Sequence, residues 1–309
     1  MEYNPKKFNI RYSATLISNK KNNSVQIWIA KPENSLCQKI NKFAISEKPK
    51  SSYKDAQGNK ILFFEFKDQK NIAIQMDIKA TLWKSKFDLE QERIFLSNAS
   101  TQLFKQYTKG EKFLEQTQEI KKLTKDITKN SKNDLDKIKS IFDFIMKNFK
   151  YCYPVKKRGV KNLNLNKLRG DCGEYSSLFV TMCRILGIPA RNSTGFVIFP
   201  KHEKISEHGW ASIYLKPYGW ADIDPQYASL EKNIKTGIKK YFGQRTDYRI
   251  TFINGFNIPL KPAVPKNFQV IYWKNLGLPM ANNSIQILQP LIFASKSRVK
   301  FKDNIKLIP

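Results

Sequence analysis

Residues 170–225 contain three residue types that together can activate a nucleophile. Cys172 supplies a thiol, His208 an imidazole and Asp224 a carboxylate, in that order along the chain. An imidazole can accept the thiol proton, and a carboxylate can hold the imidazole in one tautomer and orientation. We therefore predict a Cys-His-Asp triad that acts on acyl groups.

Cys172 is predicted to lie in the first turn of a helix that runs to Leu186. Apolar residues recur along this segment at helical spacing, and Gly187 followed by Pro189 is placed to end the helix. The free backbone N–H groups of a helix start favour an anion, so we expect a lowered pKa for the thiol. The same N–H groups can stabilise an oxyanion on the acyl group under attack.

The other two residues are predicted on neighbouring strands. His208 lies 36 residues after Cys172, and Asp224 follows 16 residues later. Antiparallel strands at His208–Leu215 and Trp220–Ile223, joined by a loop around Pro217, would bring the imidazole and the carboxylate side by side.

Each of these residues has a competitor or a purely structural interpretation. Asp222 competes with Asp224 for the third role, because alternation places both on one face of the strand. His202 is the rival base, but its neighbours are charged and its segment looks like an exposed loop. Cys183, on the apolar face of the same helix as Cys172, is expected to be a buried small hydrophobe. Two tryptophans, Trp210 and Trp220, are expected in the core or in the wall of the site.

The elements around the site follow from hydrophobic periodicity. Strands are predicted at Phe8–Leu16, Ser24–Ala30, Ile40–Ile45, Lys60–Phe66 and Asn71–Trp83, with turn signals that include Asn22-Asn23 between them. Helices are predicted at Phe113–Thr128 and from near Asn133 to Phe149, and either Asn133 or Asp134 can cap the second of them. Residues 151–169 read as a surface loop. These patterns predict a β-rich domain at 1–90 and a catalytic domain at 91–309, with a boundary in Lys84–Ser97. The tail after Asp224 is expected to close the sheet of the second domain.

The composition limits the classes of partner. The formal net charge is +29, but 46 of the 55 basic residues are lysines scattered along the chain. Because arginine is the residue that reads phosphates and bases with a planar fork, we interpret this charge as a solvated surface and expect no nucleic-acid partner. The four cysteines form neither a disulfide framework nor a zinc signature. No leader or apolar run of membrane-span length is evident, so we expect a cytoplasmic protein with no membrane partner.

Several segments resemble the transglutaminase-like superfamily. They are Gly170–Tyr175, Leu186–Arg191, His208–Trp210 and Gly219–Pro225, with Phe149–Tyr151 resembling the end of the helix ahead of the catalytic segment and Ser51–Phe66 the β-rich region of microbial members. The resemblance covers residues 50–225. Gly209 and Gln226 stand where the family often has alanine and threonine, and neither belongs to the triad.

The resemblance implies an α+β fold, with a papain-like transglutaminase core preceded by a small β-sandwich. It also implies a thiol-dependent acyl-transfer enzyme, with Cys172 as nucleophile, His208 as base and Asp224 as orienting carboxylate. Since no acidic cluster resembles a calcium site, we expect no metal and no cofactor. The favoured reaction is hydrolysis of peptide or side-chain amides in a protein or peptide substrate. The alternatives are a protein-crosslinking transglutaminase and a non-catalytic binding protein on the same fold.

Overall fold

The computed structural model describes residues 4–18, 24–87, 102–215, 219–271, 284–285, 290–297 and 299–309. The chain divides into two compact units. Unit 1 holds Ser85–Ser193 and His208–Arg245, and unit 2 holds Glu2–Lys84, Thr194–Glu207 and Thr246–Pro309. The predicted Asn22-Asn23 turn, the Pro217 loop and most of the predicted boundary region lie outside the described residues.

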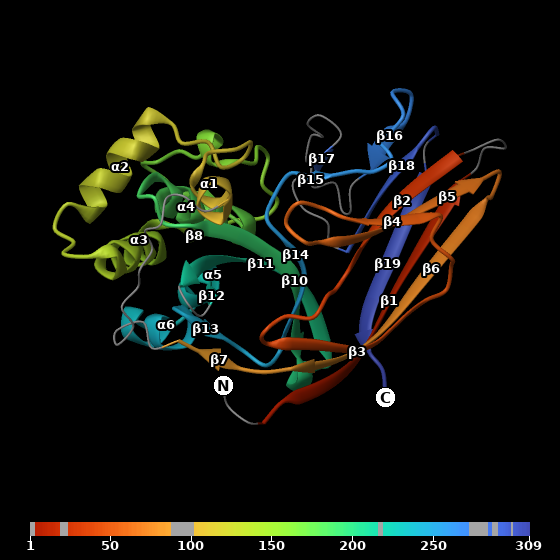
Figure 1. The fold of residues 1–309 in the computed structure, drawn as a ribbon, viewed down its shortest axis with the longest axis horizontal. Coiled ribbons are helices and arrows are strands. Elements are labelled where there is room, and N and C mark those ends of the chain that lie inside the picture. Colours follow the sequence, from red (N-terminus) through yellow and green to blue (C-terminus); the bar gives the residue numbers. More distant parts are fainter. Residues whose placement is uncertain are drawn as a thin grey trace. The chain divides into compact units, whose positions relative to one another are not determined.

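Unit 2 consists mainly of strands. Its elements are β1 (Lys6–Ser18), β2 (Ser24–Lys31), β3 (Gln38–Ile45), β4 (Ser51–Lys54), β5 (Lys60–Lys67), β6 (Asn71–Leu82), η2 (Pro200–His202), β14 (Arg249–Asn254), β15 (Ile258–Pro259), β16 (Gln269–Ile271), β17 (Ser284–Ile285), β18 (Leu291–Ser295) and β19 (Val299–Leu307). One sheet has the order β19-β1-β6-β3 and another the order β16-β18-β2-β5-β4. The long strands β1, β6 and β19 run side by side in Figure 1.

Period-two burial explains why these segments are strands. In β1 every second side chain from Ile10 to Leu16 is buried, and β6 repeats the pattern from Ile72 to Ile78. Side chains from both sheets form one hydrophobic core. Strands β1, β2, β3, β5 and β6 confirm the five predicted strands, and the arrangement is the predicted β-sandwich.

The C-terminal tail adds strands to this sandwich. β19 pairs with β1 over Ile10↔Leu307 to Ser18↔Val299, and β18 pairs with β2. The contiguous division at residue 90 therefore differs from the observed units, in which Thr246–Pro309 joins the N-terminal strands. The physical reason is long-range antiparallel pairing, which leaves no mark in any local sequence window.

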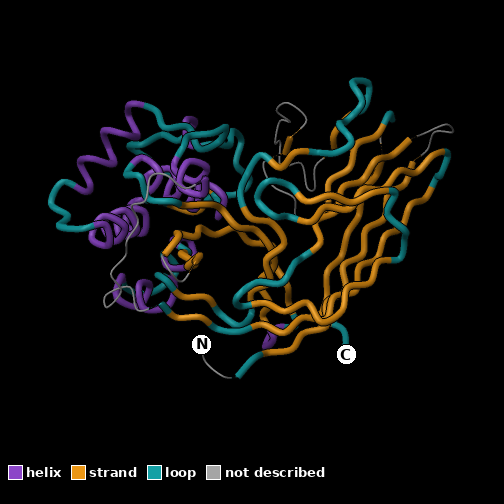
Figure 2. The backbone as a smooth tube through the Cα atoms, viewed as in Figure 1, coloured by secondary structure: helices purple, strands orange, loops and turns teal. Residues whose placement is uncertain are grey.

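All α-helices of the described residues lie in unit 1. Figure 2 colours helices purple and strands orange. The elements wholly in unit 1 are β7 (Ser85–Lys86), α1 (Gln102–Thr108), α2 (Gln118–Thr128), α3 (Asp134–Asn148), β8 (Lys150–Tyr151), η1 (Val160–Asn162), β9 (Arg169–Gly170), α4 (Cys172–Ile185), β12 (Gly219–Ile223), α5 (Pro225–Ala228), α6 (Ile234–Tyr241) and β13 (Gln244–Arg245). Two further strands, β10 (Ala190–Phe199) and β11 (Lys204–Leu215), each have residues in both units.

The helix α4 is buried almost all round, which is typical of a helix at the centre of a domain. Its N-cap is Asp171, and its end has the hydrogen-bond pattern of a Schellman motif. Gly187, with a φ of 75°, donates from its N–H to Arg184 at 3.0 Å, and the N–H of Ile188 donates to Cys183 at 2.9 Å. The predicted stop at Gly187 is confirmed.

The two preceding helices differ in how well the sequence predicted them. α3 begins after Asn133, whose side chain accepts a hydrogen bond from the N–H of Asp136 at 2.9 Å, as the predicted cap requires. The predicted helix at Phe113–Thr128 is wrong in its first part, because α2 begins only at Gln118. Phe113 has a φ of 71°, a left-handed conformation that a helix cannot contain.

Candidate active site

Cys172 is the first residue of α4 in the structure, as the sequence predicts. The backbone reaches it through β9, which pairs in parallel with β8 over Lys150↔Arg169 and Tyr151↔Gly170. Gly170 is required here, because a Cβ at this position would lie 2.4 Å from the Cβ of Glu174. The approach to the nucleophile is therefore fixed by backbone pairing on one side and by close packing on the other.

His208 and Asp224 form a buried pair. Nε2 of His208 lies 2.7 Å from Oδ2 of Asp224, and both side chains are almost fully buried. β11 and β12 pair antiparallel, and Ala211↔Ile223 is the pair of the register nearest to His208 and Asp224. Asp224 is also the N-cap of α5, where its Oδ1 accepts a hydrogen bond from the N–H of Tyr227 at 3.0 Å. The carboxylate is thus fixed at both oxygens.

Aromatic rings cover the imidazole. The ring of Tyr227 stacks on His208 with centroids 4.0 Å apart and planes 13° apart. Trp210, fully buried, lies 6.1 Å from the same imidazole at an interplanar angle of 25°. Because these rings exclude water, the bond between His208 and Asp224 lies in a low-dielectric setting, where it is strengthened.

Cys172 lies beside the strand that carries His208. The backbone N–H of Gly209 hydrogen-bonds the Cys172 sulfur, and the charge of Asp224 also acts on it. The predicted lowering of the thiol pKa is wrong. Burial of the sulfur raises the pKa of Cys172 strongly and the Asp171 charge raises it further, whereas the Gly209 N–H and Arg158 act in the opposite direction. The dipole of one helix start is a smaller effect than this desolvation.

A buried ionic cluster holds the first turn of α4. Nη1 and Nη2 of Arg158 contact the two carboxylate oxygens of Asp171 at 3.0 and 2.5 Å, and Nη1 also contacts Glu174 Oε2 at 2.8 Å. All three side chains are at most 9% exposed. Asp171 additionally accepts a hydrogen bond from the N–H of Gly173 at 2.8 Å, which caps the helix. We call Arg158, Asp171 and Glu174 the acid clamp.

The acid clamp shifts the ionisation of its members in opposite directions. Burial opposes the charge on Asp171, yet its bonds to Arg158 keep its pKa below the ordinary value. Burial and the Asp171 carboxylate raise the pKa of Glu174 to about 8, although Arg158 acts against this shift. A protonated Glu174 can donate the side-chain hydrogen bond that joins it to Asp171.

The other residues weighed from the sequence take structural positions. Asp222 accepts a hydrogen bond from Ser212 at 3.0 Å and pairs with Arg245 at 3.2 Å. Cys183 is fully buried and His202 is exposed, as expected. The guanidinium of Arg191 makes a cation–π contact with Trp220, 4.0 Å from the centroid of the indole ring.

Sequence reasoning missed Arg158, Glu174 and the stacking of Tyr227. The predicted surface loop at 151–169 contains the buried Arg158, so that prediction is wrong at this position. One signal was available, because an arginine in a lysine-rich loop suits a bidentate buried pair better than a solvated surface. No comparable signal marks Tyr227.

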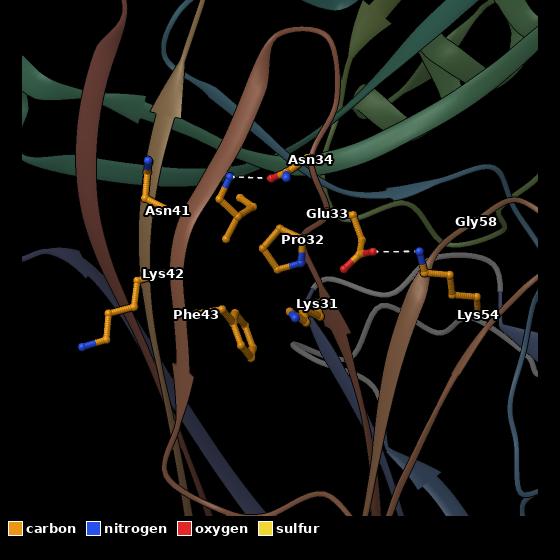
Figure 3. Close-up of a pocket in the computed structure, with 10 residues that line it drawn as sticks. Lys31, Pro32, Glu33, Asn34, Asn41, Lys42, Phe43, Lys54 and Gly58 are labelled. Atoms are coloured by element: carbon orange, nitrogen blue, oxygen red, sulfur yellow. Dashed lines mark hydrogen bonds and ion pairs between the residues drawn. The ribbon is translucent and has the colours of Figure 1, made fainter.

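A groove of about 450 Å³ lies on unit 2, between β3 and the ends of β2 and β4. Figure 3 shows that Lys54 is paired with Glu33 there, at 3.0 Å. The Ile40 N–H donates to the side-chain oxygen of Asn34. Its lining has neither a thiol nor an imidazole, so it is no candidate for the triad chemistry. Among the described residues, no three His, Cys, Asp or Glu side chains are grouped so that they could hold a metal ion.

Comparisons with known proteins identify a domain in the range that contains these residues. Residues 121–225 match the model of the transglutaminase-like superfamily, so the chain carries a transglutaminase-like domain in that range. The match contains Cys172, His208 and Asp224 and ends just after the last of them. A comparison with curated proteins gave no significant match.

One of the solved structures found in the comparison shares the fold over nearly its whole length. A "Putative Cysteine Protease" from Cytophaga hutchinsonii has 13% identity and a TM-score of 0.62, over 99% of this chain and 92% of that chain. The periplasmic domain of TgpA from Pseudomonas aeruginosa has 12% identity and a TM-score of 0.40, over 73% of this chain and 94% of that one. The first similarity supports the predicted α+β fold. In the described part of the chain, no helix is long and apolar enough to cross a bilayer.

Proposed function

We propose that the protein is a thiol-dependent acyl-transfer enzyme that hydrolyses peptide or side-chain amide bonds. The observation that carries the proposal is the buried 2.7 Å bond between His208 and Asp224, together with a thiol at the first turn of α4 on whose ionisation Asp224 and the Gly209 N–H act. A histidine fixed through Nε2 presents Nδ1 as the nitrogen that can exchange a proton with a substrate or nucleophile. A non-catalytic binding protein would have no need for this arrangement.

The proposed reaction begins with a neutral thiol, in line with the raised pKa of Cys172. Nδ1 of His208 takes the proton of Cys172 as the sulfur attacks the carbonyl carbon, and backbone N–H groups at the start of α4 stabilise the oxyanion. The imidazolium then protonates the leaving amine, which leaves a thioester on Cys172. Water, deprotonated by His208, attacks the thioester, and the carboxylic acid and the thiol are released.

The exposed ring of Tyr151 is the proposed contact for an apolar part of the substrate. Tyr151 and Tyr153 are 53% and 49% exposed, and the ionisation of Tyr151 is influenced by Cys172 and Asp171. β8 and β9 hold Tyr151 beside Gly170, two residues before the nucleophile. Exposed aromatic rings next to a reactive group are typical contacts for peptide side chains.

Replacing Tyr151 by alanine should therefore raise KM about fivefold for a peptide with an aromatic residue beside the reactive amide, with little change in kcat. Leu230→Ala is the matched control, because Leu230 is another exposed large side chain of unit 1, at 68% exposure. Steady-state kinetics of both variants would decide the matter. A KM that is unchanged in Tyr151→Ala would remove this residue from the substrate site.

We also propose that the protein acts in a reducing compartment such as the cytoplasm, on a protein or peptide substrate. Four free cysteines support this setting, because free thiols persist there. That neither nucleic acid nor membrane is a partner remains a prediction from composition.

The function is tested by a two-arm assay with a denatured protein substrate. One arm measures the release of peptides and ammonia, and the other measures incorporation of a fluorescent primary amine. We expect release to dominate, and Cys172→Ala to abolish it while Cys37→Ala leaves it unchanged. Dominant amine incorporation would identify a transglutaminase instead, and an absence of both products would favour the binding protein.

A further inference from the structure

The acid clamp has an unbalanced formal charge. Arg158 brings one positive charge, whereas Asp171 and Glu174 together bring two negative charges when both are ionised. All three are buried, and an uncompensated charge in such a place is unfavourable. One retained proton makes the cluster neutral.

The hydrogen bonds determine which carboxylate holds that proton. Both oxygens of Asp171 accept bonds from Arg158, and Oδ1 also accepts the Gly173 N–H, so this carboxylate is stabilised in its charged form. Glu174 has one bond from Arg158, through Oε2, and a side-chain bond to Asp171. The proton therefore belongs on Glu174, which donates it towards Asp171.

The clamp also lies next to the nucleophile. Asp171 directly precedes Cys172, and its charge raises the pKa of the thiol while that of Arg158 lowers it. A second negative charge on Glu174 would further oppose loss of the Cys172 proton, because like charges in a buried site interact strongly.

We propose that Glu174 is a positioning residue that is protonated in the active enzyme, so that the acid clamp caps α4 without adding negative charge beside Cys172. This inference rests on the proposed function of Cys172 as nucleophile. It makes the clamp sensitive to pH, since loss of the Glu174 proton both breaks its bond to Asp171 and charges the cluster.

Several ionisable groups lie around Glu174. Arg158 and Asp171 contact it directly, and Cys172 precedes it on the same turn of α4. Tyr151 lies on β8, Arg169 of β9 is exposed, and Lys161 of η1 pairs with Glu115 at 3.6 Å. Of these groups from the described part of the chain, Arg158 and Asp171 are the two that share side-chain hydrogen bonds with Glu174.

The direction of the pH effect on stability follows from the Glu174 pKa. Its value of about 8 in the folded chain lies above the ordinary 4.5, so between these values the folded chain holds the proton more tightly than the unfolded chain. The stabilisation from this group is complete below 4.5 and is lost as the pH rises to about 8.

The test compares iodoacetamide alkylation of Cys172 in wild type and Glu174→Gln from pH 6 to 9.5, read by peptide mass spectrometry. Glutamine keeps a hydrogen-bond donor towards Asp171 but cannot ionise. We expect equal rates at pH 6 and a variant that reacts about tenfold faster at pH 9.5. Glu111→Gln is the control, because Glu111 pairs with the buried Arg184 near the other end of α4, at 2.7 Å.

If the ratio of the alkylation rates of Glu174→Gln and wild type stays constant with pH, the proposal is wrong. If Glu174→Gln fails to fold, the carboxyl carbon of Glu174 in ¹³C-labelled wild type should titrate near 8, and titration near 4.5 would equally overturn it. The two hypotheses fail separately. Alkylation needs no substrate, so the ratio of alkylation rates tests the proposed role of Glu174 even if no acyl transfer is found. If acyl transfer is found but this ratio does not change with pH, only the proposal about Glu174 is wrong.

Discussion

Replacing His208 by alanine is expected to lower the rate of acylation of Cys172 by about a thousandfold at neutral pH. The structure gives two reasons. The thiol starts neutral because burial raises its pKa, so its proton must be taken during the attack. We propose the imidazole bonded to Asp224 as the group that takes it, because the N–H of the adjacent Gly209 acts on the ionisation of the sulfur.

The measurement is a single-turnover reaction with an activated ester of a short peptide, followed by acid quench and intact-protein mass spectrometry. His202→Ala is the control, because His202 is the other histidine of the chain and is exposed on unit 2. It should retain the wild-type rate. Equal rates in His208→Ala and His202→Ala would show that the imidazole at 208 is not the base.

Replacing Arg158 by methionine is expected to lower the free energy of unfolding by about 3–5 kcal/mol at pH 8, where both clamp carboxylates are ionised in the unfolded chain and folding must bury them without a cation. Methionine fills similar volume but leaves Asp171 and Glu174 buried without a cation. At pH 5 Glu174 retains its proton, so the loss should be smaller. Urea denaturation at the two pH values measures the difference.

Arg169→Met is the matched control for this prediction. Arg169 lies eleven residues further along the same loop region but is exposed, so its loss should change the stability by less than about 0.5 kcal/mol. Adding Asp171→Asn and Glu174→Gln to Arg158→Met should recover part of the loss, because uncharged partners need no cation. Equal effects of the two arginine substitutions would contradict a buried clamp.

Local patterns were sufficient to predict most of the secondary structure around the site. The spacing of apolar residues and Gly187 predict the helix that begins at Cys172, and Asn133 predicts the cap of α3. These signals could be read because they act within a few residues. The antiparallel strands β11, which carries His208, and β12, which ends just before Asp224, follow from alternation and chain order. All these features depend on interactions that are close in sequence.

The features that the sequence did not reveal depend on distant residues. The pairing of β19 with β1 joins residues almost three hundred positions apart, so the tail could not be assigned to unit 2 from its own pattern. Arg158 is separated from Asp171 by a segment without period, and only the folded chain shows that it is buried. The direction of the Cys172 pKa shift likewise required the burial of the sulfur, which outweighs the helix start.

The account as a whole depends on one chemical event, the transfer of an acyl group to Cys172. The most direct measurement is to quench the protein with acid during turnover of a peptide ester, digest it, and locate the acyl group by tandem mass spectrometry. The account predicts the acyl mass on the peptide that contains Cys172, and none on the peptide with the half-buried Cys152. Turnover without an adduct on Cys172, or an adduct on Cys152 that persists in Cys172→Ala, would contradict it.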